Sequence, residues 1–258
     1  STADARFCAA LARGLRIEYA TDRWMSPPSE VSEATARDAR NTFLATVRKS
    51  NRARLIWTGH QQDDIAESML MRLARGSGTG GLAAPRPVQD WASAGLRLRP
   101  LLDLSRAQLR EALRAVGATW REDESNQSPS YFRNRLRNQV VPGWIDAAGR
   151  DALAGAATAR ERLAEDDDAL EAWLQELAPW AADGSLSLKL LSGRPVALWR
   201  RALHRWVLAQ DDPGDLSRRG FEHLLALAQK GATCRFSLGK AGFVKIRKGR
   251  LSFEKLSC

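Results

Sequence analysis

The sequence has little cysteine and little histidine, three residues of each among 258. Cys8, Cys234 and Cys258 lie far apart, and this spacing makes neither a disulfide framework nor a paired-cysteine metal site. Such cysteine usage suits a reducing compartment, so we predict a cytoplasmic protein. The scattered histidines argue against a structural zinc site.

Long apolar runs are lacking as well. No stretch is long enough to span a bilayer and none has the pattern of a signal peptide, so we expect no membrane partner. We find no internal repeat and no low-complexity segment. A chain of this length has room for one large domain or two smaller ones with an ample core.

Positive charge, by contrast, is abundant and unevenly distributed. The net charge is +10, and residues 194–258 hold 14 Lys and Arg against 5 Asp and Glu. A basic region confined to one part of a chain favours a polyanionic partner such as nucleic acid. An arginine-rich soluble surface is the alternative explanation, so the charge alone does not decide.

The first half alternates helices with short apolar strands, which predicts a parallel sheet with crossover helices. The expected helices span residues 1–13, 33–49, 64–75 and 103–117, and the expected strands span 14–19, 55–58 and 96–99. Residues 85–95 are expected to form a loop. So small a sheet does not stand alone, and we interpret residues 1–145 as the back half of a larger α/β domain.

The second half, residues 146–258, is predicted to be a mainly helical domain with a small β element at its end. Helical patterns cover 147–180, 194–210 and 217–230, and short strands follow at 234–238, 243–247 and 251–253. The acidic run 165–168 within the first of these helices is expected to form a solvated face.

Two carboxylates mark the junction between the strand at 55–58 and the helix that follows. Asp64 and Glu67 are three residues apart, so they share the first helical turn and one face. Open α/β sheets keep their chemistry at such junctions. The competing interpretation is a capping box, in which the acidic pair satisfies free backbone N–H groups.

A glycine-rich segment follows that helix. It contains Gly76-x-Gly78-x-x-Gly81, formally a dinucleotide fingerprint, but that motif must follow a strand and open a helix. Here it follows a helix, so we reject the dinucleotide interpretation. Two interpretations remain: a flexible helix exit, or a mobile loop that lets phosphate or RNA backbone approach, with Arg75 as its charge.

Arg133 and Arg137 are four residues apart on one helical face, and Asn126 precedes them in a polar loop. The arginines are either surface residues with snorkelling side chains or a cluster that clamps phosphate or carboxylate through pairs of hydrogen bonds. Pro142 is expected to end or kink this helix.

The order of these motifs is more specific than any one of them. The order is His60-x-x-Asp-Asp-x-x-Glu67, Arg75-Gly-Ser-Gly, Arg99-Pro-Leu-Leu, Glu122-Asp-Glu-Ser-Asn126 and Arg133-Asn-Arg-Leu-Arg137. It resembles the tRNA(Ile)-lysidine synthetase family of pyrophosphatase-loop ATPases, closely over residues 36–142 and weakly beyond.

That resemblance implies a Rossmann-like, adenine nucleotide α-hydrolase-like fold and a ligase that attaches free L-lysine to the wobble cytidine of an isoleucine tRNA. ATP adenylates the 2-oxo group of the base, and the lysine ε-amine then displaces AMP. The implied cofactors are ATP and Mg²⁺, which together with arginines would stabilise the charge on the triphosphate. The oligomeric state is left open, a homodimer being one alternative.

The resemblance also implies the residues of the site. Asp64, Glu67, Asn126 and Arg137 match catalytic positions, and Asp64 is in addition the candidate Mg²⁺ ligand. The carboxylates would orient the cationic lysine, and one of them would accept the proton that the amine loses. The expected nucleotide contacts are Gly59 and His60, and the expected tRNA contacts are Arg75, Arg133, Arg200, Arg201, Lys245, Arg247 and Lys248.

One feature of the family is lacking. Its first strand leads into Ser-Gly-Gly-x-Asp-Ser, a loop whose backbone amides cradle pyrophosphate, and the sequence has no such motif. We therefore expect an N-terminally truncated chain that lacks the first strands of its sheet and is inactive as it stands. The alternatives are a non-catalytic tRNA-binding remnant and a tRNA thiolase of the same superfamily, against which the isolated cysteines argue.

Overall fold

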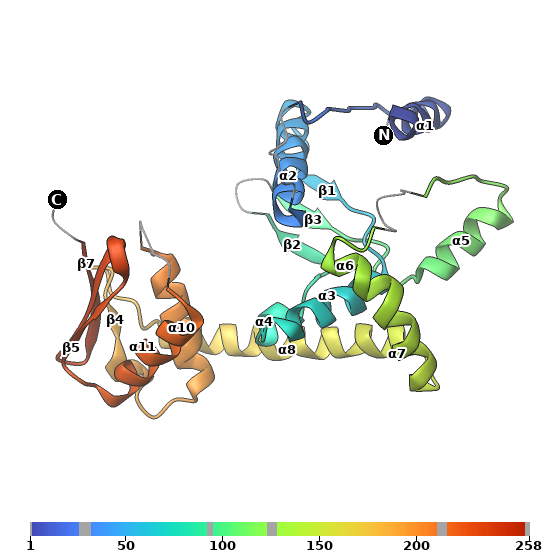
Figure 1. Ribbon diagram of the computed structural model, residues 1–258. Helices are drawn as coiled ribbons and strands as arrows, with labels where there is room; N and C mark the ends of the chain where they lie inside the picture. The colour runs from blue at the N-terminus through green and yellow to red at the C-terminus, as the bar shows by residue number, and fades with distance from the viewer. Residues whose placement is uncertain (1, 26–31, 92–94, 123–127, 211–215, 256–258) are drawn as a thin grey trace. The chain divides into compact units, whose positions relative to one another are not determined.

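The computed structural model describes residues 2–25, 32–91, 95–122, 128–210 and 216–255. The chain divides into two compact units, Ser1–Ala164 and Glu165–Cys258, and each has its own fold (Figure 1). The division falls inside the long helix α8, Ala152–Leu177. A functional domain boundary at residue 145 stays a prediction.

The first unit combines a small sheet with helices, which confirms the α/β class. Its helices are α1 (Thr2–Leu15), α2 (Glu33–Ser50), α3 (Gln62–Ala74), α4 (Thr79–Leu82), α5 (Arg106–Ala115), α6 (Phe132–Arg135), the π-helix η3 (Leu136–Val140), α7 (Val141–Ala148) and the first half of α8. Its strands are β1 (Leu55–Trp57), β2 (Val88–Asp90) and β3 (Leu96–Leu98).

The sheet of the first unit has the order β1-β3-β2. β1 and β3 run parallel, with Leu55 opposite Leu96, and the chain between them passes through α3. This is the helical crossover that the alternation of elements predicts. β2 is antiparallel to β3 and lies where the sequence predicts a loop. None of its three residues is buried, so β2 carries no alternating apolar pattern that would reveal a strand.

The strand predicted at residues 14–19 is wrong. Helix α1 continues to Leu15, and the chain from residue 17 to residue 24 has no regular secondary structure. Ile17 and Tyr19 expose 60% and 40% of their surfaces. An extended segment becomes a strand only where its backbone groups pair with a neighbouring strand, and within the described residues this segment has no such neighbour.

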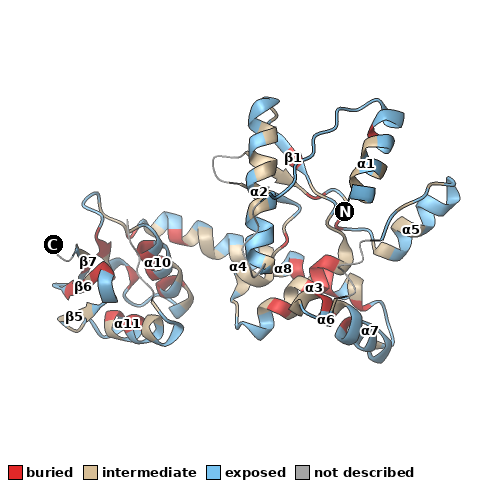
Figure 2. Ribbon diagram, turned by 45° about the horizontal axis from the view of Figure 1, so that its top comes forward, coloured by how far each residue is buried: buried red, intermediate tan, exposed pale blue. Residues whose placement is uncertain are grey.

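Helix α3 supplies the core of the first unit. Ile65 and Ala66 are almost fully buried and pack with Leu102 and with Ala156 and Ala157 of α8. Figure 2 shows the buried positions gathered along α3, whereas α5 has no buried residue. Because burial fixes this face of α3, the first turn of the helix is held firmly beside the end of β1.

Helices α6, η3 and α7 follow one another without a break, and Pro142 lies in the first turn of α7. A proline has no N–H, and its ring crowds the carbonyl four residues earlier. The π-turn Leu136–Val140 lies directly before Pro142 and relaxes this conflict by widening the helix. The helix therefore continues past Pro142, with Arg133 and Arg137 on successive turns.

The second unit packs helices against a four-stranded antiparallel sheet of order β4-β7-β6-β5. Its elements are the second half of α8, β4 (Leu186–Ser187), α9 (Leu188–Leu191), α10 (Val196–Leu208), α11 (Arg218–Lys230), β5 (Cys234–Ser237), the 3₁₀ turn η4 (Gly239–Ala241), β6 (Gly242–Arg247) and β7 (Arg250–Lys255). The predicted helices and the small C-terminal β element are confirmed. β4 is an additional strand that the sequence did not reveal.

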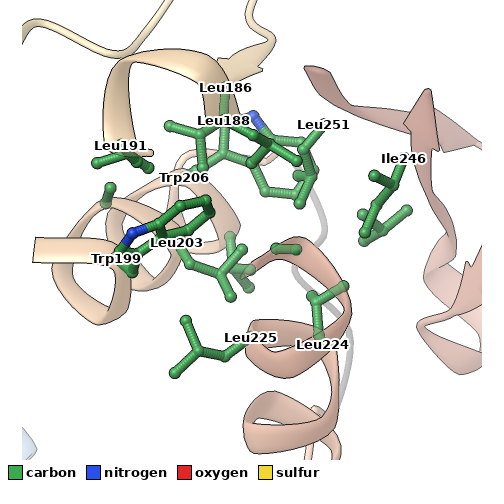
Figure 3. Close-up of a cluster of buried hydrophobic side chains, with 14 of the residues drawn as sticks. Leu186, Leu188, Leu191, Trp199, Leu203, Trp206, Leu224, Leu225, Ile246 and Leu251 are labelled. Carbon is green, nitrogen blue, oxygen red and sulfur yellow. The ribbon is translucent and has the colours of Figure 1, made fainter. Parts of the chain in front are cut away.

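Leucine and tryptophan side chains fill the core of the second unit (Figure 3). Trp206 of α10 is 1% exposed, and its Nε1–H donates to the carbonyl of Gly184 at 2.7 Å, so this tryptophan is buried with its donor satisfied. The acidic run of α8 is not wholly solvated, because Asp167 is largely buried in an ion pair with Arg201. Among the described residues, no helix has the length and apolar character that crossing a bilayer requires.

Candidate functional site

A cleft of about 460 Å³ opens where β1 ends. Thr58, Gly59 and His60 connect β1 to α3 and line this cleft. The rest of its wall comes from neighbouring elements, namely Arg40, Asn41, Leu44, Trp57, Asp64, Arg97, Arg133, Asn134 and Arg137. The cleft thus lies at the carboxyl end of a parallel strand, where open α/β sheets bind their ligands.

Asp64 both caps α3 and contributes to the cleft. The N–H of Gln61 donates to Asp64 Oδ2 at 2.8 Å, the bond that the third helical residue makes in a capping box. Asp64 Oδ1 accepts from Arg133 Nη2 at 2.7 Å. The capping interpretation is therefore correct for Asp64 and wrong for Glu67, which has other partners.

Two backbone contacts hold the first turn of α3 against the start of α5. The N–H of Arg106 donates to Asp63 Oδ2 at 2.8 Å, and the N–H of Gln62 donates to the carbonyl of Leu104 at 2.9 Å. A carboxylate at a helix N-terminus also interacts favourably with the helix dipole. The acidic end of α3 is thereby fixed from two sides.

Glu67 is enclosed by arginine side chains and is 1% exposed. Arg137 binds both of its oxygens, with Nε to Oε1 at 2.6 Å and Nη2 to Oε2 at 2.9 Å. Arg133 Nε donates to Oε2 at 2.8 Å, and Arg106 Nη2 lies 3.5 Å from Oε1. Of the two interpretations of Arg133 and Arg137, the structure supports the clamp, and the carboxylate they hold belongs to the protein itself.

These contacts control the protonation of Glu67. Burial alone would raise the pKa of Glu67, but hydrogen bonds from Arg137 and Arg133 and the charges of both outweigh burial and lower it below its ordinary value. The hydrogen bond to Glu67 in turn raises the pKa of Arg137. Glu67 is therefore ionised near neutral pH with little tendency to take up a proton, which suits it to holding two guanidinium groups.

His60 is a neutral group in the cleft at neutral pH. Burial lowers the pKa of His60 to about 4; Asp64 acts in the opposite direction, and nearby arginine charges lower the pKa further. Its Nδ1 lies 2.9 Å from Thr58 Oγ1. His60 thus brings a hydrogen-bonding ring to the cleft without adding positive charge.

Arg99, which begins the Arg99-Pro-Leu-Leu motif, has a structural role rather than a place in the cleft. It is 6% exposed, and burial lowers its pKa to about 10. Its Nη1 donates to the carbonyl of Arg86 at 2.6 Å, and its Nη2 donates to Gln89 Oε1 at 2.7 Å. Arg99 therefore joins the end of β3 to β2 and the segment before it.

The glycine-rich segment after α3 is not simply a loop, because it contains the short helix α4. Arg72 of α3 donates to the carbonyl of Gly81, and a Cβ at Gly81 would lie 2.7 Å from Ser77 Cβ. This close approach therefore requires glycine. Arg75 is exposed at the C-terminal end of α3 and does not line the cleft.

The predicted tRNA-binding residues of the second unit fall into two groups. Lys245, Arg247 and Lys248 line an open cleft of about 500 Å³, together with Asp183, Ser185, Arg250 and Ser252. Arg200 instead pairs with Glu222, and Arg201 pairs with Asp167 and Glu171. The first group is the one arranged to meet an external anion.

Asn126, a predicted catalytic residue, lies outside the described residues. Several residues that line the cleft were not predicted from the sequence. Asn134 lines the cleft, is 7% exposed and donates through Nδ2 to the carbonyl of Ser128 at 2.9 Å. Arg40 and Arg97 also line it. Arg97 alternates with leucines along a strand, but only the packing of α2 beside the sheet brings Arg40 to the same place.

Magnesium binding at Asp64 stays a prediction. No group of three or more His, Cys, Asp and Glu side chains that could hold a metal occurs in the described part of the chain. Both oxygens of Asp64 already accept hydrogen bonds, and Arg133 is one of the donors. A Mg²⁺ ion there would take its remaining oxygen ligands from waters and substrate phosphates, as Mg²⁺ commonly does.

Comparison with known protein families matches residues 1–144 to the family described as PP-loop domain. The tRNA(Ile)-lysidine synthase of Salinispora arenicola is 38% identical over 202 residues, which cover 76% of this chain and 59% of the relative. The enzyme of the same name from Pseudomonas putida is 35% identical over 209 residues, 78% of this chain and 48% of the relative. The chain spans about half the length of the curated relatives it matches.

Proposed function

Because the chain belongs to the PP-loop domain family, we propose that it is part of a tRNA(Ile)-lysidine synthase. The observation that carries this proposal is the cleft at the end of β1, where Asp64, Arg133 and Arg137 lie together. These residues come from the motifs whose order along the chain resembles the family. The substrates are ATP, free lysine and an isoleucine tRNA with cytidine at the wobble position. The relatives at 33–39% identity bear this enzyme name.

The reaction proceeds in two transfers. The 2-oxo oxygen of the cytidine attacks the α-phosphorus of ATP, an O–P bond forms, and pyrophosphate leaves. The ε-amine of lysine then attacks C2, the C–O bond to the adenylate breaks, AMP leaves, and the nitrogen loses a proton. Cationic side chains in a partly buried cleft stabilise the negative charge that develops on phosphate oxygens.

We assign different roles to the two carboxylates. Asp64 lines the cleft, so it is the carboxylate that contacts the lysine ammonium and is within reach of its proton. Glu67 does not line the cleft and is held by Arg133 and Arg137. Glu67 is therefore a positioning residue that fixes the two guanidinium groups at the cleft wall.

Lys245, Arg247 and Lys248 are proposed to bind the phosphate backbone of the tRNA. They form an open basic cleft in the second unit, and backbone binding needs cations that are free to meet phosphate oxygens. Arg75, exposed beside the glycine-rich segment, is a candidate for the same role. Mg²⁺ is proposed only as an ion that arrives with ATP, because the described residues offer it no cage.

The test is lysine transfer. The full-length protein is incubated with ATP, labelled lysine and an unmodified isoleucine tRNA transcript, with the Salinispora arenicola enzyme as positive control and the 258-residue chain, which we expect to be inactive, alongside. We expect the full-length protein to label the tRNA, with the Asp64→Asn variant at least 100-fold slower and the Glu111→Gln variant, which exchanges an exposed carboxylate on α5, unchanged.

The same assay separates the alternatives. Binding of the tRNA with no incorporation, while the control enzyme is active, would favour the non-catalytic tRNA-binding role. Incorporation of sulfur instead of lysine would favour a tRNA thiolase. None of the residues that line the cleft is a cysteine, so we do not expect the second outcome.

A further inference from the structure

Two arginines that line the cleft are not neutralised by Asp64 or Glu67. Arg133 and Arg137 are matched by Asp64 and Glu67, with which they form short ion pairs. Arg40 and Arg97 also line the cleft. Within the described part of the chain, neither Arg40 nor Arg97 pairs with a carboxylate.

Arg97 is held in place although it has no counter-ion. Its Nη2 donates to Asn41 Oδ1 at 3.0 Å, and its guanidinium lies 4.0 Å from the centroid of the Trp91 ring. Its Nε is buried without a hydrogen-bond partner. Stacking and one hydrogen bond thus orient a charged group in a place where burial disfavours the charge.

Arg40 adds like charge on the opposing element. It lines the cleft from α2, is exposed, and also lines a neighbouring cleft together with Asp22. After the larger effect of burial, its charge lowers the pKa of Arg97. Two guanidinium groups that repel each other are unfavourable unless an anion joins them. His60, neutral at neutral pH, adds no charge to the cleft, so about two positive charges remain uncompensated there.

We propose that Arg40 of α2 and Arg97 of β3 form a phosphate-binding site in the cleft, one that binds a phosphate group of a substrate. Two arginines suit a group that carries two charges and several acceptor oxygens in fixed geometry, better than they suit the single charge of a carboxylate. The inference rests on the proposed function for its setting, since both ATP and tRNA supply phosphate oxygens.

The first experiment uses inorganic tripolyphosphate as the probe, with binding to the 258-residue chain followed by calorimetry. Arg40→Gln is the main variant, because Arg40 is exposed and, within the described residues, its side chain makes no hydrogen bond or ion pair on which the fold depends. We expect its affinity to fall about tenfold, the usual effect of losing one charge-assisted hydrogen bond. Arg162→Gln is the matched control: Arg162 is exposed on α8, and its loss changes the net charge equally.

Arg97 is tested by two variants because it also contacts α2. Arg97→Gln removes the charge, whereas Arg97→Lys keeps the charge and loses the planar guanidinium. If the site needs both the charge and the planar guanidinium donors, affinity for tripolyphosphate falls in both variants, and it falls more in Arg97→Gln. Circular dichroism of each variant shows whether the first unit is still folded.

Repeating the titrations with ATP and with isoleucine tRNA identifies the source of the phosphate. Weakened ATP binding with unchanged tRNA binding assigns the site to the nucleotide, and the reverse assigns it to the tRNA backbone. Equal affinity of wild type, Arg40→Gln and Arg97→Gln for all three ligands overturns the inference. No lysine transfer by the full-length protein, together with weaker tripolyphosphate binding by the Arg40→Gln variant, would refute the proposed function and leave the phosphate site standing.

Discussion

At the scale of single residues, the arrangement around Glu67 explains why the two carboxylates of one helical turn behave differently. Glu67 is buried and bound by three arginines, while Asp64 caps its helix and lines the cleft. Removing one member of a buried ion pair leaves the partner charge without compensation, which costs more than the pair itself contributes. Two predictions follow from these environments.

Glu67→Gln is expected to destabilise the first unit by about 3–5 kcal/mol, because it leaves Arg133 and Arg137 beside a neutral amide. Arg137→Gln should also be destabilising. The double variant should lose clearly less than the two single losses combined, because the pair is then removed together. Urea unfolding measures all three, with Glu111→Gln on exposed α5 as control. If the losses in unfolding free energy of the two single variants simply added in the double variant, the ion pair between Glu67 and Arg137 would be contradicted.

His60 is expected to titrate near pH 4, because burial and arginine charges disfavour its cationic form. Its unfolded pKa is about 6.5, so the unfolded chain takes up this proton first. The stabilising contribution is therefore complete above pH 6.5 and is lost as pH falls toward 4, on the order of 1–2 kcal/mol for a partly solvent-screened group. NMR titration of the three histidines measures it, with His60→Asn identifying the resonance. A midpoint near 6.5 would refute the burial of this ring.

At the scale of elements, glycines decide where segments approach closely, and Gly242 at the start of β6 is the strictest case. Its φ is +138°, and a Cβ there would lie 2.3 Å from the carbonyl oxygen of Glu254 on β7. Gly239, three residues earlier, also has positive φ (+68°) but has open space around it. The two positions therefore separate backbone strain from steric overlap.

Gly242→Ala is expected to destabilise the second unit by more than about 3 kcal/mol, since the sheet must part to admit the methyl group. Gly239→Ala should cost only about 1–2 kcal/mol, the usual penalty of a left-handed alanine. Calorimetric unfolding measures both variants, and the change should fall on the transition of the second unit. Similar losses in both variants would mean that β6 and β7 do not pack as described.

At the scale of the whole molecule, the cations after residue 194 include arginines already paired within the second unit and others that line an open cleft. Arg200 and Arg201 belong to the paired set, and Lys245, Arg247 and Lys248 belong to the open set. Deleting residues 194–258 would remove α10, α11 and the sheet, and with them the core of this unit. Point variants are thus the sharper test of tRNA binding.

Replacing Lys245, Arg247 and Lys248 together by alanine is expected to weaken tRNA binding and to reduce the slope of log K against log salt by up to about 2–3. Arg200→Gln is the control, because its charge is already matched by Glu222, and it should change the slope little. Filter binding at several salt concentrations measures both. An unchanged slope in the triple variant would remove these residues from the tRNA interface.

The sequence by itself determined the α/β class, the helix from the end of β1, the helices of the second unit and the family, because hydrophobic periodicity, caps and motif order are local properties. It also singled out Asp64, Glu67 and Arg137, with Asn126, as catalytic candidates, and it assigned Arg133 to tRNA binding. The tertiary structure alone decided the ion-pair partners: Glu67 pairs with Arg133 and Arg137, and Asp64 lines the cleft. It also decided that residues 14–19 are not a strand and that Arg40 joins Arg97. Ion pairing and strand pairing join residues far apart in the chain, so no local pattern encodes them.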